Sequence, residues 1–264
     1  MVLPLAYAIC NVSVMPVRGE PAHRAEQTTQ LLFGEKAEIV EINNKDWTRI
    51  RCTWDGYDGW CKKSQLKVID KKEYRKPLKY LSGNHNGKLI MDSNEMLLPL
   101  GSELYGLIGG WITPMNDAGR FKGEKINLKD IVLSSEGLKN AALQYLHAPY
   151  QWGGRSAAGI DCSGFTQMVF KLCNHAIPRD ADKQASEGTL VDFLQHAQCG
   201  DLAFFDDREG KIVHVGMLLD NENIIHATDT SGRVVIDRID QAGIISKSLR
   251  MRTHNLRVVK RINP

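Results

Sequence analysis

The feature that most limits how this chain can fold is the segment APYQWGGRSAAGIDCSGF, residues 148–165. Its glycines favour a loop, and the residues after Cys162 have the apolar spacing of a helix. Asp161 can act as the N-cap of that helix, which places Cys162 in the first helical turn. Unpaired N–H groups and the positive end of the helix dipole favour a thiolate there. The segment therefore predicts a reactive cysteine where a loop becomes a helix.

Composition sets wide bounds on the rest of the chain. A length of 264 residues allows one large domain or two to three small ones, and 42% hydrophobic with 25% charged residues is typical of a soluble globular protein. The net charge of +3 could favour an anionic polymer such as a cell wall, but it does not indicate nucleic acid. No run of about 18 apolar residues occurs, so we expect no membrane span.

The cysteines leave the redox compartment open. None of the six forms a C-x-x-C pair, which disfavours a zinc knuckle. Cys52 and Cys61 flank a predicted hairpin turn and could lie opposite one another; a disulfide is one interpretation, and two free thiols are the simpler one. The first ten residues, MVLPLAYAIC, lack a basic region and do not form a full signal peptide as written. Neither observation decides the compartment.

Strand and turn signals divide the chain into three parts. Residues 1–70 contain predicted strands at 37–42, 47–53 and 59–63 with turns between them, a pattern typical of a small β-barrel. Residues 71–129 repeat this texture more weakly and suggest a diverged second copy. Residues 130–264 begin with a predicted helix after Ser134 or Ser135.

The third part has helices first and strands afterwards. Five strand signals follow the cysteine helix: DLAFFDD, KIVHVGMLLD, NIIHATD, RVVIDRI and LRVVKRI. This order predicts an α+β fold with an antiparallel sheet.

Two strand histidines are candidate partners of Cys162. Alternation in V-H-V-G-M would put His214 on one face of its strand, and His226 follows after a connection short enough for a hairpin. A cysteine nucleophile needs an imidazole that accepts its proton and later protonates the leaving amine, and a third group that orients the imidazole. Neighbouring strands would bring both histidines to one cysteine.

Each of these residues has a simpler interpretation when it is taken alone. Cys162 could be a small buried hydrophobic residue, His214 a satisfied core histidine, and His226 the end of a strand. Cys173, further along the same helix, has the spacing of a core residue. The remaining histidines of this part, His147, His175, His196 and His254, are predicted to lie at the surface.

Several ordered motifs in residues 131–264 resemble the NlpC family of cell-wall cysteine peptidases. They are PYQWGG, DCSGF, GDLAFF, VHVGMLL and IIHAT. The resemblance implies a papain-like α+β catalytic domain with Cys162 as nucleophile, His214 as base and acid, and His226 as the residue that orients it. The backbone N–H of Cys162 would contribute to an oxyanion hole. This mechanism needs no metal or organic cofactor.

The first part resembles an SH3-like module of a particular subgroup, the γ-D-glutamyl-L-diamino-acid endopeptidases, also called dipeptidyl-peptidase VI. The matching segments are VRGEPAHRAEQTTQLLFGEKAEIVE and DGYDGW. The resemblance implies two SH3-like domains before the peptidase domain. It also implies that Glu26, Tyr57 and Asp161 hold the free amine of an N-terminal L-alanine, with Glu35 as an alternative to Glu26. Asp161 would then both cap its helix and face the amine, and these demands compete.

Further positions follow from the same resemblance. Ser163 would contact the substrate backbone or the D-Glu carboxylate, Arg179 and Asp180 would lie beside the site, and Tyr150 and Trp152 would flank the cleft. Relatives often carry Ser where this chain has Ala181, so one hydrogen bond to that carboxylate would be missing or supplied differently.

The resemblance implies cleavage of L-Ala-γ-D-Glu-diamino acid peptides from peptidoglycan between D-Glu and the diamino acid. For this substrate the resemblance implies a bacterial envelope or periplasmic protein, with the cytoplasm as the alternative. The sequence does not choose between Lys and meso-diaminopimelate, and it says nothing of the oligomeric state. Two alternatives stay open. One is a less selective wall hydrolase or amidase, which Glu26 and Tyr57 disfavour. The other is a wall-binding protein with an inactive catalytic domain, which the presence of Cys162, His214 and His226 disfavours.

Overall fold

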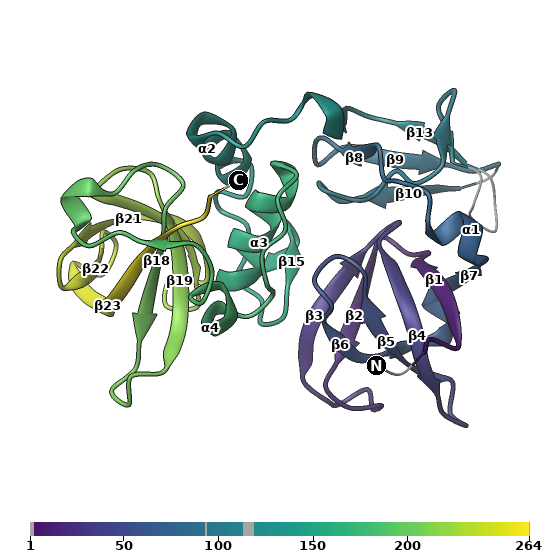
Figure 1. Ribbon diagram of the computed structural model, residues 1–264, viewed down its shortest axis with the longest axis horizontal. Helices are drawn as coiled ribbons and strands as arrows, with labels where there is room; N and C mark the ends of the chain where they lie inside the picture. Colours follow the sequence, from purple (N-terminus) through teal and green to yellow (C-terminus); the bar gives the residue numbers. More distant parts are fainter. Residues whose placement is uncertain (1–2, 93, 113–118, 264) are drawn as a thin grey trace. The chain divides into compact units, whose positions relative to one another are not determined.

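A computed structural model describes residues 3–92, 94–112 and 119–263 (Figure 1). The chain forms two compact units. The first consists of residues 1–131 together with residues 155–157, and the second of residues 132–154 and 158–264. No helix in the described part of the chain is long and apolar enough to span a membrane.

The first unit begins with a seven-stranded antiparallel sheet in the order β3-β2-β6-β5-β4-β1-β7. Its strands are β1 (Ala6–Cys10), β2 (Val14–Arg18), β3 (Gln27–Leu32), β4 (Lys36–Ile42), β5 (Trp47–Cys52), β6 (Asp58–Lys62) and β7 (Leu66–Ile69). Alternate apolar residues such as Val17, Ile39 and Ile50 form a buried core on one side of the sheet. The three strands predicted in this region are confirmed.

The hairpin between β5 and β6 corrects one expectation. Cys61 lies opposite Thr48, not opposite Cys52. The connection is short enough for Cys52 N–H to donate to the Tyr57 carbonyl, which fixes the register. Both thiols are buried and free, and the other four cysteines of the chain are free as well.

Residues 71–130 add a short helix and a second group of strands to the first unit. The elements are α1 (Lys71–Tyr74), β8 (Tyr80–Ser82), β9 (Gly87–Ile90), β10 (Glu95–Leu98), β11 (Leu107–Ile108), β12 (Trp111–Ile112), β13 (Gly119–Lys122) and β14 (Lys125–Asn127). A five-stranded sheet has the order β10-β9-β13-β12-β11, and β14 pairs with β8. Ile9 of β1 and Phe33, the residue after β3, share one core with Leu89 and Leu98 of the second sheet.

The second unit starts with its helices. α2 (Ser135–Leu143) is capped by Ser134, one of the two serines that the sequence offers for this role, and its hydroxyl accepts from Gly137 N–H. α3 (Cys162–Leu172) is buried along its length and packs against α2, and α4 (Ala181–Gln184) is a single turn. The short strands β15 (Arg155–Ser156) and β16 (Gly159–Ile160) form a hairpin just before α3.

The strands of the second unit close into a barrel. Their order is β17-β23-β18-β19-β20-β21-β22, and an additional pairing of β22 with β23 closes the ring (Figure 1). The strands are β17 (Thr189–Leu190), β18 (Leu202–Asp206), β19 (Ile212–Leu218), β20 (Asn223–Thr228), β21 (Arg233–Asp240), β22 (Gly243–Ser246) and β23 (Met251–Arg261). All five predicted strands are confirmed. The sequence missed β17 and β22, and β23 begins at Met251, earlier than predicted.

Candidate active site

Cys162 is the first residue of α3, and Asp161 is its N-cap, as the sequence predicts. An Asp161 carboxylate oxygen accepts from Gly164 N–H at 2.7 Å. A side chain at Gly164 would collide with the Gly154 carbonyl and approach this carboxylate, which explains why glycine stands two residues after the cysteine. The loop, the cap and the helix therefore fix the position of the thiol together.

The Cys162 thiol is buried, with 7% of the residue exposed. Burial and, to a smaller extent, the negative charge of Asp161 raise its pKa to about 12, although a backbone hydrogen bond with Val215 acts in the opposite direction. The expectation of a thiolate favoured by the helix start is therefore wrong, because the loss of solvent outweighs the helix dipole. Cys162 rests as a thiol, and its reaction requires a neighbouring base.

His214 and His226 lie on neighbouring strands, as predicted, and their rings meet. His214 Nε2 is 2.9 Å from His226 Nδ1, and both residues are buried. His214 is on β19, the strand on which Val215 bonds the thiol, and α3 packs against β19 and β20. A Cβ on Gly216 would lie 2.8 Å from the Cβ of His226, so a glycine at this position allows the close approach of the two strands.

Asp237 continues this arrangement, and the sequence analysis missed it. His226 Nε2 is 3.3 Å from Asp237 Oδ2, and Asp237 Oδ1 accepts from Lys247 N–H at 2.8 Å. Val235 lies opposite His226 in the β20–β21 register, so Asp237 is its diagonal neighbour. An acid within the apolar strand RVVIDRI, next to a histidine strand, is the signal that could have identified it.

His254 on β23 corrects a second expectation. It was predicted to lie at the surface, but it is partly buried and its ring stacks on His214 with a centroid distance of 4.1 Å and an interplanar angle of 25°. Burial, reinforced by the nearby His226, lowers the pKa of His254 to about 4. Burial together with His226 and His254 also holds the pKa of His214 well below 6.5. Both imidazoles are therefore neutral at neutral pH, and His214 can accept a proton.

A second buried group lies at the start of α3. Arg179 donates to Asp161 Oδ1 at 3.0 Å and Oδ2 at 2.6 Å, and to the Ser163 hydroxyl at 2.8 Å. Gly153 N–H also donates to Asp161 Oδ2, at 2.8 Å. The Asp161 carboxylate thus caps the helix and pairs with a guanidinium at the same time.

The other predicted residues of the second unit are less enclosed. Burial raises the pKa of Tyr150, and the nearby Cys162 and Asp161 raise it further, which places the phenol beside the thiol. Trp152 is 61% exposed. Asp180 precedes α4 without a side-chain cap hydrogen bond, and Ala181 is the first residue of that helix.

Glu26 and Tyr57 belong to the first unit. Glu26 is exposed just before β3, and Tyr57 packs partly against the core of the first sheet. Glu35, the alternative to Glu26, is 2% exposed and its carboxylate accepts from Arg155 at 2.8 and 3.0 Å. Arg155 belongs to the same unit, so the Glu35 charge is already compensated there.

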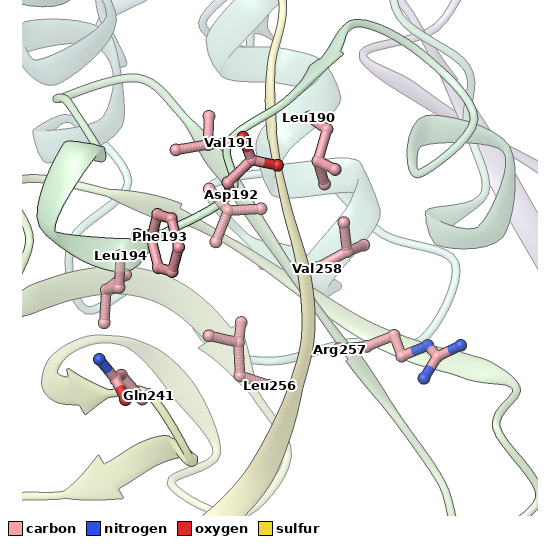
Figure 2. A pocket seen from close by; sticks show the side chains of 10 residues that line it. Leu190, Val191, Asp192, Phe193, Leu194, Gln241, Leu256, Arg257 and Val258 are labelled. Carbon is pink, nitrogen blue, oxygen red and sulfur yellow. The ribbon is translucent and has the colours of Figure 1, made fainter.

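A groove of about 390 Å³ lies elsewhere on the barrel of the second unit. It is lined by residues 190–194 and 256–259 together with Gln241, which Figure 2 shows around the strand that carries Leu256 and Val258. Most of the side chains that line it are apolar, and the polar ones are Asp192, Gln241 and Arg257. The groove is therefore distinct from the group around Cys162.

A cysteine at the start of a helix, packed against a sheet that carries linked histidines, defines the thiol–imidazole site of a cysteine hydrolase. Comparisons with known proteins agree with this class. Residues 147–253 match the NlpC/P60 family, and residues 17–66 match the bacterial dipeptidyl-peptidase SH3 domain. The chain belongs to the NlpC/P60 family of cysteine peptidases and carries an N-terminal SH3-like domain.

Individual relatives extend the similarity over most of the chain. A γ-D-glutamyl-L-lysine dipeptidyl-peptidase of Bacillus subtilis is 33% identical over 229 residues, which are 79% of this chain and 74% of that protein. The dipeptidyl-peptidase 6 of Lysinibacillus sphaericus is 26% identical over 258 residues, 89% of this chain and 92% of that one. A crystal structure of an NlpC/P60 family protein from Bacillus cereus is similar to this chain, with a TM-score of 0.82 at 22% sequence identity. The similarity covers 98% of this chain and 100% of that one, and it supports the fold described above.

Proposed function

We propose that this chain cleaves the bond between γ-D-Glu and the diamino acid, Lys or meso-diaminopimelate, in peptidoglycan stem peptides with a free N-terminal L-Ala. Such a reaction serves cell-wall turnover or recycling. The observation that carries the proposal is the buried row formed by His214 and His226 beside Cys162. The relatives that match most of the chain are named for γ-D-glutamyl-L-lysine or dipeptidyl cleavage, which supports the choice of bond.

In the proposed reaction the Cys162 sulfur attacks the γ-carbonyl carbon of D-Glu while His214 takes the thiol proton. His214 then gives this proton to the leaving amine of the diamino acid, and a water molecule hydrolyses the thioester that remains on Cys162. Negative charge develops on the carbonyl oxygen during both steps. The Cys162 N–H, at the positive end of α3, is a donor suited to stabilise this charge.

Recognition of the free amine is the selective part of the proposal. A buried ammonium group needs a negative partner, because an unpaired buried charge is costly. We propose Glu26 for this role, with Tyr57 and Asp161 as further acceptors. The pairing of Glu35 with Arg155 supports Glu26 over Glu35. Because Arg179 already balances the charge of Asp161, Glu26 would supply the net negative charge.

The D-Glu α-carboxylate would be recognised near the start of α3. We propose that Ser163 and Arg179 contribute to this contact, with Asp180 beside them and with Tyr150 and Trp152 flanking the bound peptide. Arg179 is buried against Asp161 and Ser163, so its own position is fixed before a substrate binds. Ala181 has no hydroxyl that could contact this carboxylate. In the proposal, the Ser163 hydroxyl makes this contact instead.

A finer domain division forms part of the proposal. We propose SH3-like domains at residues 1–70 and 71–129 and the peptidase domain at 130–264. The match to a dipeptidyl-peptidase SH3 domain at residues 17–66 supports the first of these. The separate five-stranded sheet after α1 is the observation that favours a second, diverged domain.

The free-amine proposal is tested by incubating the protein with L-Ala-γ-D-Glu-L-Lys and with its N-acetylated form, and measuring released lysine. We expect release from the free peptide and a loss of about 10²-fold or more in kcat/KM with the acetylated one, because acetylation removes the charged amine that Glu26 would bind. Similar rates with both peptides would instead identify a less selective wall hydrolase.

The nucleophile is tested in the same assay with Cys162→Ser. Cys199→Ser is the matched control, because Cys199 is a partly exposed thiol in the same unit. We expect Cys162→Ser to be inactive and Cys199→Ser to keep full activity. A binding protein without catalysis would show no lysine release in any form.

A further inference from the structure

We propose that Asp237 is a positioning residue that fixes the tautomers of His226 and His214, so that His214 Nδ1 is left unprotonated as the base for Cys162. The inference rests on the proposed thiol–imidazole reaction. Asp237 lies in none of the NlpC-like motifs quoted above, and it is not one of the groups named for the thiol–imidazole reaction.

The geometry is a row of groups that crosses three neighbouring strands. His214 on β19 meets His226 on β20 through Nε2 and Nδ1, 2.9 Å apart, and His226 Nε2 faces Asp237 Oδ2 on β21 at 3.3 Å. All three residues are buried, with 6%, 0% and 3% exposed. The order of the contacts is fixed by the sheet, because β19, β20 and β21 are adjacent in the barrel.

Asp237 determines which ring nitrogens of this row donate and which accept hydrogen bonds. Burial raises the pKa of Asp237, but hydrogen bonds from His226 and Lys247 N–H outweigh it and lower the pKa, so the group is ionised and only accepts. His226 must then carry its proton on Nε2, because that nitrogen faces Asp237. A neutral imidazole has one N–H, so His226 Nδ1 is an acceptor.

The tautomer of His226 determines the tautomer of His214. His226 Nδ1 needs a donor, and His214 Nε2 is the atom within hydrogen-bond distance of it. His214 therefore carries its proton on Nε2, which leaves a lone pair on Nδ1. This is the ring nitrogen not used by His226, and it is the one that can accept the thiol proton. When it does, the buried imidazolium is linked through His226 to the Asp237 carboxylate, which stabilises the charge.

The two oxygens of Asp237 have separate partners, and this makes a sharp substitution available. Oδ1 accepts from Lys247 N–H at 2.8 Å, and Oδ2 accepts from His226. In Asp237→Asn the amide oxygen must stay with the Lys247 N–H, which is a fixed donor. The amide NH₂ then faces His226 Nε2 and donates to it. His226 protonates on Nδ1, His214 receives that bond on Nε2, and His214 Nδ1 carries a proton where the base should be.

The first readout is the long-range ¹⁵N–¹H NMR spectrum of the imidazoles, which distinguishes protonated from unprotonated ring nitrogens without substrate. We expect Nε2–H on both His214 and His226 in the native protein and Nδ1–H on both in Asp237→Asn. A native spectrum with Nδ1–H on His214 overturns the inference. An unchanged tautomer in Asp237→Asn overturns it as well.

The second readout is the alkylation rate of Cys162 by iodoacetamide at pH 7, followed by peptide mass mapping. We expect Asp237→Asn to slow it at least about 10-fold, and to lower kcat for L-Ala-γ-D-Glu-L-Lys at least about 10²-fold with little change in KM. If Asp237→Asn slows the alkylation of Cys162 but the native protein does not cleave this peptide, the proposed substrate is overturned and the inference about Asp237 stands. Alkylation and kcat within twofold of the native values, roughly the scatter of such assays, would overturn the inference.

Two further variants separate positioning from folding. Asp237→Glu keeps a group that only accepts, so we expect the native tautomers and a partial recovery of kcat relative to Asp237→Asn. Asp240→Asn is the matched control on the same strand, because Asp240 pairs with Arg252 at the surface and has no contact with the histidines among the hydrogen bonds described. Native tautomers with a kcat as low in Asp237→Glu as in Asp237→Asn would show a purely structural role and overturn the proposal.

Discussion

Arg179 donates to both carboxylate oxygens of Asp161, the residue that caps the helix of Cys162. Both side chains are buried, with 2% and 8% exposed. The carboxylate of Asp161 meets the capping demand, because it accepts from Gly164 N–H of its own helix while it also pairs with a guanidinium. The start of α3 is thus built around a buried ion pair, and the position of the nucleophile depends on it.

The first prediction concerns the stability that this pair provides. Arg179→Met should lower the free energy of unfolding by about 3–5 kcal/mol, because it leaves the buried Asp161 carboxylate without its opposite charge. Urea denaturation of both forms measures the change. Arg252→Met is the control, because it breaks the exposed pair with Asp240 and should cost far less stability. Equal losses in the two variants would contradict the account.

The second prediction is a loss of stability at mildly acidic pH. The pKa of His214 lies well below 6.5 and that of His254 is about 4 in the folded protein, in each case because of burial. As the pH falls below 6.5, His214 and His254 bind protons in the unfolded chain but not in the folded protein. The free energy of unfolding therefore decreases until the pH reaches the pKa that each ring has in the folded protein. Each ring contributes a slope of up to about 1.4 kcal/mol per pH unit.

Urea denaturation at several pH values between 7.5 and 4 tests this sign. His254→Phe keeps the aromatic stack on His214 and removes one of the two groups, so its curve should be flatter between pH 6.5 and 4. A steeper slope in His254→Phe than in the native protein would refute the burial argument.

The third prediction concerns the contact between β19 and β20. A methyl group in Gly216→Ala would lie 2.8 Å from the His226 Cβ and 2.7 Å from an Ile224 methyl group, so the strands must separate. We expect a loss of about 1–3 kcal/mol in stability and a fall in kcat as His214 and His226 move apart. Gly19→Ala, where the nearest atom is at 3.7 Å, is the control and should change neither. Native kcat in Gly216→Ala would show that this spacing does not matter.

The sequence predicted the features that depend on neighbouring residues. The N-cap at Asp161, the helix that follows and the histidine hairpin all rest on local spacing, and all are confirmed. Asp237 and His254 escaped because their contacts join strands whose alignment is set by the closed barrel. The thiolate expectation at Cys162 failed for a related reason, since burial by distant segments cannot be read from the helix start alone.

The fourth prediction concerns the free thiols. Denaturation and alkylation without a reductant should label six cysteines, because all six are free. In the native protein Cys199 should react more readily than Cys10 and Cys61, because these two residues are fully buried. Burial also raises the pKa of both thiols, that of Cys61 to about 12. Intact mass and peptide mapping measure both quantities. Four labels with Cys52 and Cys61 protected would indicate the disulfide that the β5–β6 register excludes.

The central claim is that Cys162 attacks the γ-carbonyl of D-Glu, and acid quenching during turnover of L-Ala-γ-D-Glu-L-Lys tests it most directly. The quenched protein is digested and mapped by mass spectrometry. We predict an L-Ala-γ-D-Glu thioester on the peptide that contains Cys162, with lysine already released. An adduct that retains lysine, an adduct on another residue, or undiminished cleavage by Cys162→Ser would contradict the account.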